Sequence, residues 1–247
     1  MLRCLIRAHA CALSLLAGIP VAASAREDTL VAALAAAAPR ADAHVIDAAA
    51  RALSCAEGAA LVRNTRALSV IDYSRPSTEP RLWVFDLTQQ KLLYEERVAH
   101  GKNTGDDRAL RFSNAPGSLM SSIGVFLTAD TYVGHNGYSL RLRGLEPGFN
   151  DRALERDIVV HGASYVDGDV VSLLGRLGRS FGCPAVRPAI AHALIDTIRD
   201  GSLLVAYYPD PDWLRRSTLV GTCAATADAQ VSAPAIAETN PATLAPR

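Results

Sequence analysis

His161 and Cys183 are the two side chains whose surroundings best suit covalent chemistry. His161 ends a short apolar run and precedes Gly162, and Cys183 stands between Gly182 and Pro184 in a predicted tight turn. A thiol is mostly protonated at neutral pH, and a neighbouring imidazole can accept its proton and so generate a nucleophile. The pair therefore indicates cysteine-dependent acyl transfer, with N–H groups of the turn as an oxyanion hole.

The same residues also have interpretations without this chemistry. A histidine on a buried strand and a free cysteine are both common in protein cores. The glycine and proline around Cys183 argue against a core role, because a core cysteine does not need a tight turn. A zinc site from His100, His161 and Cys183 is disfavoured, since the sequence has no closely spaced ligand pair such as C-x2-C or HExxH.

Length and charge indicate a single domain of ordinary size and give no indication of nucleic-acid binding. The chain has 247 residues, 25 basic and 25 acidic side chains and a formal net charge of +0. This length suits one domain with a sizeable core plus extensions. The balanced charge, without a basic block, gives no reason to expect a nucleic-acid partner.

Residues 1–25 are typical of a secretory signal peptide. Arg3 and Arg7 precede an apolar stretch over residues 8–21, and an A-x-A cleavage triplet occupies residues 23–25. The stretch is short for a membrane span, and an uncleaved anchor is the alternative. We therefore expect an exported, periplasmic protein with no transmembrane segment after cleavage.

Cysteine usage agrees with an exported protein that keeps one thiol free. Of the 5 cysteines, Cys55, Cys183 and Cys223 remain beyond the predicted signal. An odd number in an exported protein points to a free or intermolecular thiol. A Cys55–Cys223 disulfide that leaves Cys183 free is the simplest arrangement, and Cys55 as an ordinary core residue is the alternative.

Periodicity divides the remaining chain into an arm, a domain and a tail. Residues 26–66 are rich in Ala and Leu at helical spacing, which predicts a helical N-terminal arm. Residues 67–212 contain short alternating and apolar runs separated by turn residues, the pattern of a β domain. Because His161 and Cys183 lie in this region, it is the predicted catalytic domain. Residues 213–247 are mostly Ala, Thr and Pro after Cys223, which predicts a C-terminal extension that is largely disordered.

The domain is predicted to be mainly β. The predicted strands cover residues 68–73, 81–87, 92–99, 121–127, 138–142, 158–161 and 202–208, and the predicted short helices cover residues 170–177 and 187–199. A polar turn joins the second and third strands, which predicts a hairpin. Many short strands with few helices predict a β-sandwich or barrel-like domain and not a βαβ sheet.

These segments together resemble the L,D-transpeptidase (YkuD-like) catalytic domains, which remodel bacterial peptidoglycan, and in particular their murein L,D-transpeptidase branch. The resemblance runs from about residue 69 to residue 208. It rests on His161-Gly162, on Gly178-Arg179-Ser180-Phe181-Gly182-Cys183-Pro184-Ala185, and on the segments at residues 98–103 and 137–142.

The sequence departs from the family pattern in three places. Phe181 occupies the position before Gly-Cys that is usually histidine, and the linker between His161 and Ser180 is slightly longer than the common form. Ala185 stands two residues after the cysteine, where the family often has an Asn or Arg that helps to bind substrate. Arg179 and Arg187 are the candidates to replace that residue.

The resemblance implies a role for each residue of the motif. Cys183 would be the nucleophile and His161 its base, the Gly162 carbonyl would orient the imidazole, Ser180 would support the turn, and the N–H groups at Gly182 and Cys183 would form the oxyanion hole. The candidate substrate-contacting residues are His100, Arg179, Phe181 and Arg187. The implied substrate is a peptidoglycan tetrapeptide stem that loses its terminal D-Ala, and no metal or other cofactor is needed.

Three other functions remain open. With water as acceptor, the same site would be an L,D-carboxypeptidase. A papain-like hydrolase is disfavoured, because such enzymes generally place the cysteine before the histidine in the chain. A catalytically silent wall-binding domain of the same fold is the alternative from another class, and the departures at Phe181 and Ala185 leave room for it.

Overall fold

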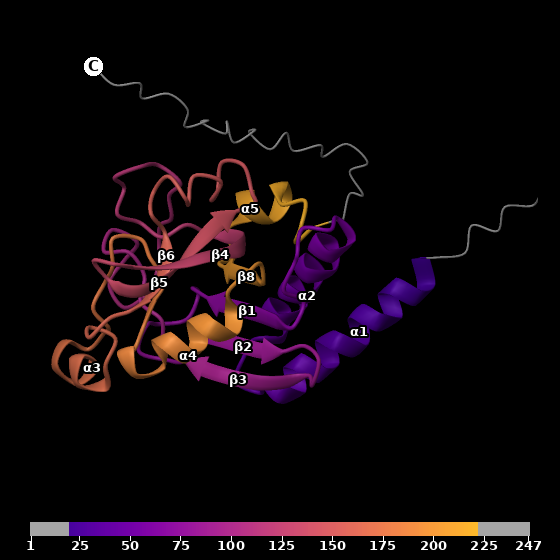
Figure 1. Ribbon diagram of the computed structural model, residues 1–247, viewed down its shortest axis with the longest axis horizontal. Coiled ribbons are helices and arrows are strands. Elements are labelled where there is room, and N and C mark those ends of the chain that lie inside the picture. Colours follow the sequence, from indigo (N-terminus) through magenta and orange to yellow (C-terminus); the bar gives the residue numbers. More distant parts are fainter. Residues whose placement is uncertain (1–19, 222–247) are drawn as a thin grey trace, which may run out of the picture.

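The computed structural model describes residues 20–221, and an eight-stranded sheet with helices on both faces forms the core of the fold (Figure 1). The helices are α1 (Pro20–Ala37), α2 (Ala43–Gly58), α3 (Gly168–Leu174), α4 (Pro188–Ile198) and α5 (Pro211–Arg216). The strands are β1 (Ala67–Asp72), β2 (Leu82–Asp86), β3 (Lys91–Glu96), β4 (Gly124–Gly134), β5 (Gly137–Gly144), β6 (Val159–Gly162), β7 (Ala185–Val186) and β8 (Leu203–Tyr207). The predicted mainly β, barrel-like class is confirmed.

The sheet order is β3-β2-β1-β8-β4-β5-β6-β7. The predicted β2–β3 hairpin is present, whereas the parallel pairs β1–β8 and β6–β7 were not foreseen. In β8, Leu203 and Val205 face a core shared with α2, and Leu204 and Ala206 face a core shared with α4. Successive side chains alternate between faces, so burial on both sides requires the continuous apolar run seen in the sequence.

Helix α2 belongs to the same core as the sheet. The Asp42 carboxylate caps its first turn by accepting a hydrogen bond from the His44 N–H at 2.8 Å. Its apolar face, which includes Ile46 and Leu53, is buried in one cluster with Trp83 of β2. The predicted N-terminal helices therefore exist and one of them packs directly on the sheet, while the division into separate regions at residues 26–66 and 67–212 stays a prediction.

The cysteines differ in state. Cys55 is disulfide-bonded, which excludes the alternative of an ordinary core cysteine, and Cys183 is free. Cys223, the predicted partner of Cys55, lies outside the described residues, so that pairing stays a prediction. Residues 1–19 of the predicted signal peptide also lie outside them, and α1 begins within the predicted signal, at Pro20.

Packed structure continues past residue 212. Trp213, in α5, is fully buried, and its Nε1 donates a hydrogen bond to the Glu146 carboxylate at 2.8 Å. The start of the predicted disordered extension is therefore part of the core, and residues 222–247 lie outside the described part of the chain. Between residues 20 and 221, no helix combines the length and apolarity that crossing a bilayer requires.

Backbone contacts between its two ends nearly close the sheet. After β3 the chain runs beside β7, where the Ala99 N–H donates to the Ala185 carbonyl at 2.8 Å and the Lys102 N–H donates to the Ser180 carbonyl at 2.8 Å. On its other side β7 pairs with β6. The turn that leads into β7, which carries Cys183, is therefore held from two sides.

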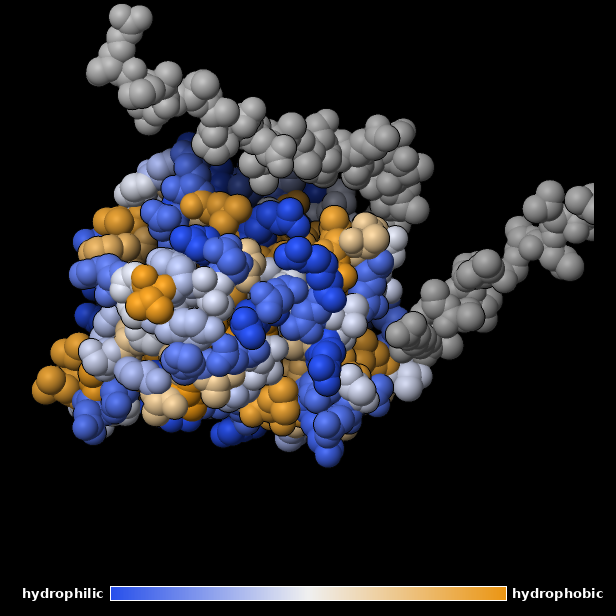
Figure 2. Space-filling model, viewed as in Figure 1, coloured by the Kyte–Doolittle hydropathy of each residue, from blue (hydrophilic) through white to orange (hydrophobic). Residues whose placement is uncertain are grey.

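Helix α3 forms the connection between β6 and β7 and projects at the end of the molecule opposite the start of α1 (Figure 1). Its Leu173 and Leu174 are 82% and 51% exposed. Figure 2 shows apolar side chains gathered at the corner where this helix lies. The predicted short helix after His161 is thus present. It exposes apolar rather than polar side chains on the connection between β6 and β7.

Candidate active site

Strand β6 delivers His161 to the site. The imidazole is 4% exposed, and its Nδ1 lies 3.0 Å from the Gly162 carbonyl oxygen. Donation from Nδ1–H to this carbonyl leaves Nε2 unprotonated and able to accept a proton. Burial lowers the pKa of His161 and so favours the neutral ring. A Cβ on Gly162 would lie 2.9 Å from the Ala191 Cβ, so glycine permits the close packing of α4 on this strand.

Ser180 organises the turn before β7. Its hydroxyl donates to the Cys183 carbonyl at 2.6 Å and accepts a hydrogen bond from the Gly182 N–H at 3.1 Å. Gly182 has φ of 133°, and a Cβ there would lie 2.8 Å from the Met120 carbonyl oxygen, so only glycine fits without strain. The Gly182 N–H, expected in the oxyanion hole, is already bonded within the turn.

Cys183 lies beside the strand that carries His161. Ala185, two residues further along the chain, pairs directly with His161 across β6 and β7. The thiol is 8% exposed and donates a hydrogen bond to the Asp157 carbonyl at 3.5 Å rather than to the imidazole. Burial raises the pKa of the Cys183 thiol, and the Arg156 guanidinium opposes that rise. The resting group is therefore a protonated thiol that needs a base.

Among the expected substrate-contacting residues, Phe181 is the most exposed. Its side chain is 70% exposed next to Gly182 and Cys183, and the Lys102 ammonium lies 4.9 Å from its ring centroid. An apolar ring under a cation forms a surface on which a ligand with both apolar and anionic parts can rest. Lys102 was not among the residues that the sequence patterns singled out.

The two candidate arginines are held by carboxylates. Arg179 donates to Asp106 at 2.8 Å. Arg187 forms a bidentate pair with Glu96, with bonds of 2.8 and 2.6 Å. Both side chains are partly exposed. A substrate carboxylate would have to compete with these pairs, so a direct replacement of the family's usual substrate-binding residue by either arginine stays a prediction.

His100 lies behind the turn instead of facing solvent. The ring is 1% exposed, its Nδ1 accepts a hydrogen bond from Arg81 Nη2 at 2.8 Å, and its Nε2 lies 3.3 Å from the Gly105 carbonyl oxygen. Its own carbonyl accepts a hydrogen bond from the Ser180 N–H at 3.0 Å. This corrects the expectation of a substrate contact for His100, because a ring enclosed in this way supports the turn from the inside.

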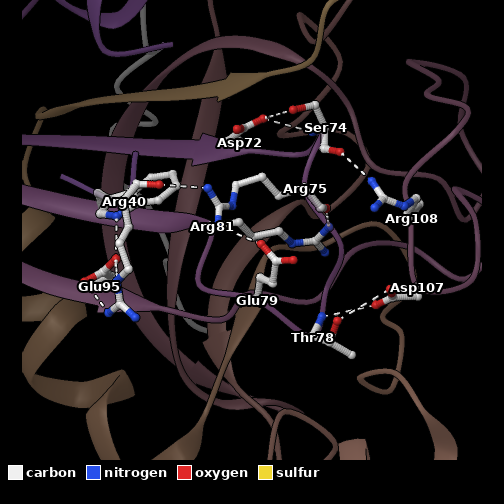
Figure 3. Close-up of polar contacts among 11 residues, drawn as sticks. Arg40, Asp72, Ser74, Arg75, Thr78, Glu79, Arg81, Glu95, Asp107 and Arg108 are labelled. Carbon is white, nitrogen blue, oxygen red and sulfur yellow. Dashed lines mark hydrogen bonds and ion pairs between the residues drawn. The ribbon is translucent and has the colours of Figure 1, made fainter. Parts of the chain in front are cut away.

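Arg81 is a fully buried arginine that sequence reasoning missed. It donates twice to the Val98 carbonyl, at 3.0 and 2.7 Å. It also donates once to the Arg75 carbonyl, at 2.8 Å (Figure 3). Its guanidinium lies 5.2 Å from the Tyr73 ring centroid. Burial lowers the pKa of Arg81 to about 10, so the group stays charged at neutral pH. It fixes the chain that runs from β3 along β7.

Ser121 is another residue that sequence reasoning missed. Its hydroxyl donates to the Gly182 carbonyl at 2.9 Å and accepts a hydrogen bond from the Gly101 N–H at 3.0 Å. Ser121 therefore ties the turn to the segment after β3. A serine before an apolar run carries no signal of this role, because the contact depends on residues far away in the sequence.

The burial of His100 is expected to make folding stability depend on pH. Burial and the charge of Arg81 lower the pKa of His100 from 6.5 to about 4. The unfolded chain binds this proton more readily, so stability is complete above pH 6.5 and falls by roughly 3 kcal/mol as the pH drops to about 4. Urea unfolding at a series of pH values measures this loss.

A His100→Gln variant is the matched control for that measurement. Glutamine can accept from Arg81 and donate to the Gly105 carbonyl, yet it does not titrate. The difference in unfolding free energy between the two proteins should therefore change across this pH range. Parallel curves for the two proteins would contradict the assignment.

A cavity of about 750 Å³ lies elsewhere, between α1, α2 and the β2–β3 turn, with Leu30, Leu53 and Leu87 in its wall. None of the residues around Cys183 lines it, and the chemistry of the side chains places the candidate site at the turn before β7. Within residues 20–221, no group of three or more His, Cys, Asp or Glu side chains is arranged to hold a metal ion.

Comparisons with known proteins found one matching family model and several similar solved structures. A family model described as "L,D-transpeptidase catalytic domain" matches residues 37–207. Similar solved structures include an L,D-transpeptidase from Mycobacterium smegmatis, at 14% identity and a TM-score of 0.37 over 58% of this chain and 59% of that one. Another is the L,D-transpeptidase from Stackebrandtia nassauensis, at 12% identity and a TM-score of 0.35 over 68% of each chain. The chain thus spans 59% of the length of the Mycobacterium smegmatis structure. No curated protein is a match.

Proposed function

Because this chain belongs to the L,D-transpeptidase catalytic domain family, we propose that it is a peptidoglycan L,D-transpeptidase with Cys183 as nucleophile and His161 as base. One observation chiefly supports the proposal. The strand beside the free cysteine presents an imidazole whose Nδ1 is committed to the Gly162 carbonyl, which leaves Nε2 for proton transfer.

The first half-reaction forms a thioester. The Cys183 side chain rotates away from the Asp157 carbonyl, and His161 Nε2 accepts the thiol proton. The sulfur attacks the carbonyl carbon of the third residue of a tetrapeptide stem. The C–N bond to the terminal D-Ala then breaks, and His161 returns the proton to the leaving amine. The products are free D-Ala and an acyl group on Cys183.

Among the N–H groups of the turn, we assign the Cys183 N–H as the donor that binds the oxyanion of the tetrahedral intermediate. The Gly182 N–H is bonded to Ser180 and serves the turn instead. In other acyl-transfer enzymes, one such donor lowers the barrier by about 3–4 kcal/mol. The exposed ring of Phe181 borders the entrance and, with Lys102, offers a surface for the stem peptide.

The second half-reaction transfers the acyl group. His161 Nε2 takes a proton from an amine as the amine nitrogen attacks the thioester carbonyl. The C–S bond breaks, and His161 passes that proton to the sulfur, which restores the thiol of Cys183. A side-chain amine of a neighbouring stem gives a 3–3 crosslink, and water gives L,D-carboxypeptidase activity. The substrate lies outside the inner membrane, which agrees with an exported, periplasmic protein.

Incubation of the purified protein with a disaccharide tetrapeptide tests the proposal. We expect free D-Ala, a crosslinked dimer, and a protein adduct with the mass of the tripeptide acyl group that maps to the peptide containing Cys183. Tripeptide without dimer would assign the carboxypeptidase reaction instead. If neither product nor adduct forms, and a carbapenem also leaves the protein unmodified, the silent wall-binding domain becomes the better description.

A further inference from the structure

Arg156 lies beneath the turn that carries Cys183, on the segment that enters β6. A Cβ on Gly182 would lie 3.4 Å from Arg156 Nη2, so the guanidinium is in van der Waals range of the turn. Its Nη1 donates to the Ser113 carbonyl and the Ser122 hydroxyl, both at 2.6 Å. These contacts hold the guanidinium in one position against the turn that carries the thiol.

Every acceptor of Arg156 is uncharged. Nη2 donates to the Met120 carbonyl at 2.6 Å and to the Ser118 hydroxyl at 3.1 Å. Among residues 20–221, no carboxylate forms an ion pair with Arg156, and the adjacent Glu155 is paired with Arg152. The positive charge beside the turn is therefore not neutralised by another side chain of the described residues.

The arrangement does not suit a substrate carboxylate. Both terminal nitrogens already donate to protein oxygens, and Nε is buried without a hydrogen-bond partner. A bidentate clamp on a ligand would need two free donors that point to solvent. The charge of Arg156 is instead available to a group buried close to it, and Cys183 is such a group.

The other ionisable groups around the thiol cannot supply a positive charge in the resting enzyme. Tyr73, after β1, and Tyr165, after β6, have pKa values raised to about 12 by burial and are neutral. Asp157 is exposed and its negative charge opposes thiolate formation. His161 on β6 is neutral before it takes the proton.

We propose that Arg156 is a positioning residue that stabilises the thiolate of Cys183 through an uncompensated charge held under the Gly182 turn. This inference rests on the proposed function in that Cys183 is taken as the nucleophile. When His161 removes the thiol proton, the sulfur becomes an anion in a nearly dry site, and a fixed cation nearby lowers the free energy of that anion. The charge acts before any substrate bond is made or broken.

The pH dependence of Cys183 alkylation by iodoacetamide tests this inference without any peptidoglycan. In Arg156→Gln and Arg156→Met, the midpoint of the rate profile should move up by about 1 pH unit. A less acidic thiol is a stronger nucleophile once ionised, so the rate well below the midpoint should fall only about threefold. Arg156→Lys keeps the charge, so its midpoint should lie close to the wild-type value.

Arg152→Gln is the matched control, because it removes an equal charge from an exposed side chain on the same segment and should leave the midpoint unchanged. Cys183→Ala gives the background from other thiols. Folded neutral variants with the wild-type midpoint would overturn the inference, as would a lysine variant that shifts as far as glutamine. Failure of both neutral variants to fold would show a purely structural role and overturn it too. A protein that is inactive on muropeptides can still show the shift in the alkylation midpoint. The role of Arg156 and the proposed transpeptidase activity can therefore be refuted independently of each other.

Discussion

The Cys183→Ala protein is expected to form no acyl adduct and to release no D-Ala above background. Alanine removes the only atom that the proposed mechanism joins to the stem peptide, and the neighbouring Ser180 hydroxyl is committed to the Cys183 carbonyl. Loss of the nucleophile in another acyl-transfer enzyme lowers kcat by roughly 10⁶-fold. Mass spectrometry of the protein after incubation with a tetrapeptide muropeptide, together with assay of free D-Ala, measures both effects.

Two further variants distinguish the loss of a catalytic group from a general effect of substitution on the folded protein in that experiment. His161→Gln should lower the rate about 10²- to 10⁴-fold, and activity should rise with pH because hydroxide then replaces the base. His192→Gln alters an exposed ring on α4 and should behave like the wild type. Adduct formation on Cys183→Ala, or a His161→Gln protein with full activity at neutral pH, would exclude the assigned roles.

Arg81→Met is expected to lower the free energy of unfolding by roughly 3–5 kcal/mol. The Val98 and Arg75 carbonyls and the His100 Nδ1 all lose a donor, and each such buried acceptor costs about 1–3 kcal/mol when unpaired. Relief from burying the guanidinium offsets part of that cost. Urea unfolding at pH 7, followed by circular dichroism, gives the difference directly.

The effect of Arg81 should extend to the site. The segment fixed by this residue flanks Ser180, so Arg81→Met should also slow acylation of Cys183 in protein that is still folded. Arg215→Gln, at an exposed arginine with contacts only inside α5, is the matched control and should stay within about 0.5 kcal/mol of the wild type. A loss below 1 kcal/mol in Arg81→Met would contradict the argument.

Local patterns were sufficient for the parts of this fold that depend on neighbouring residues. The alternation and turn around β2 and β3 predicted their hairpin, and the apolar run before His161 predicted β6. Strand β7 was missed because its two residues, Ala185 and Val186, are too few for any periodicity. The parallel pairing of β1 with β8 was missed because nothing local identifies a partner so far along the chain.

The same limit applies to the site. His161, Cys183 and Ser180 could be identified from sequence because each belongs to a short motif. Arg81 and Arg156 could not, because an arginine becomes informative only when its burial and its lack of a carboxylate partner are known. His100 stands in a polar, glycine-bounded loop, a pattern typical of surface turns, and tertiary packing alone places it inside.

The position of β8 in the sheet has a consequence for how the protein acquires its structure. This strand comes last along the chain, yet it lies between β1 and β4 and joins β3-β2-β1 to β4-β5-β6-β7. Until residue 203 and those after it have been synthesised, β1 and β4 both lack the strand that lies between them, so each has an open edge on that side. The eight-stranded sheet can therefore be completed only after β8 has been synthesised, when all of its other strands are already present.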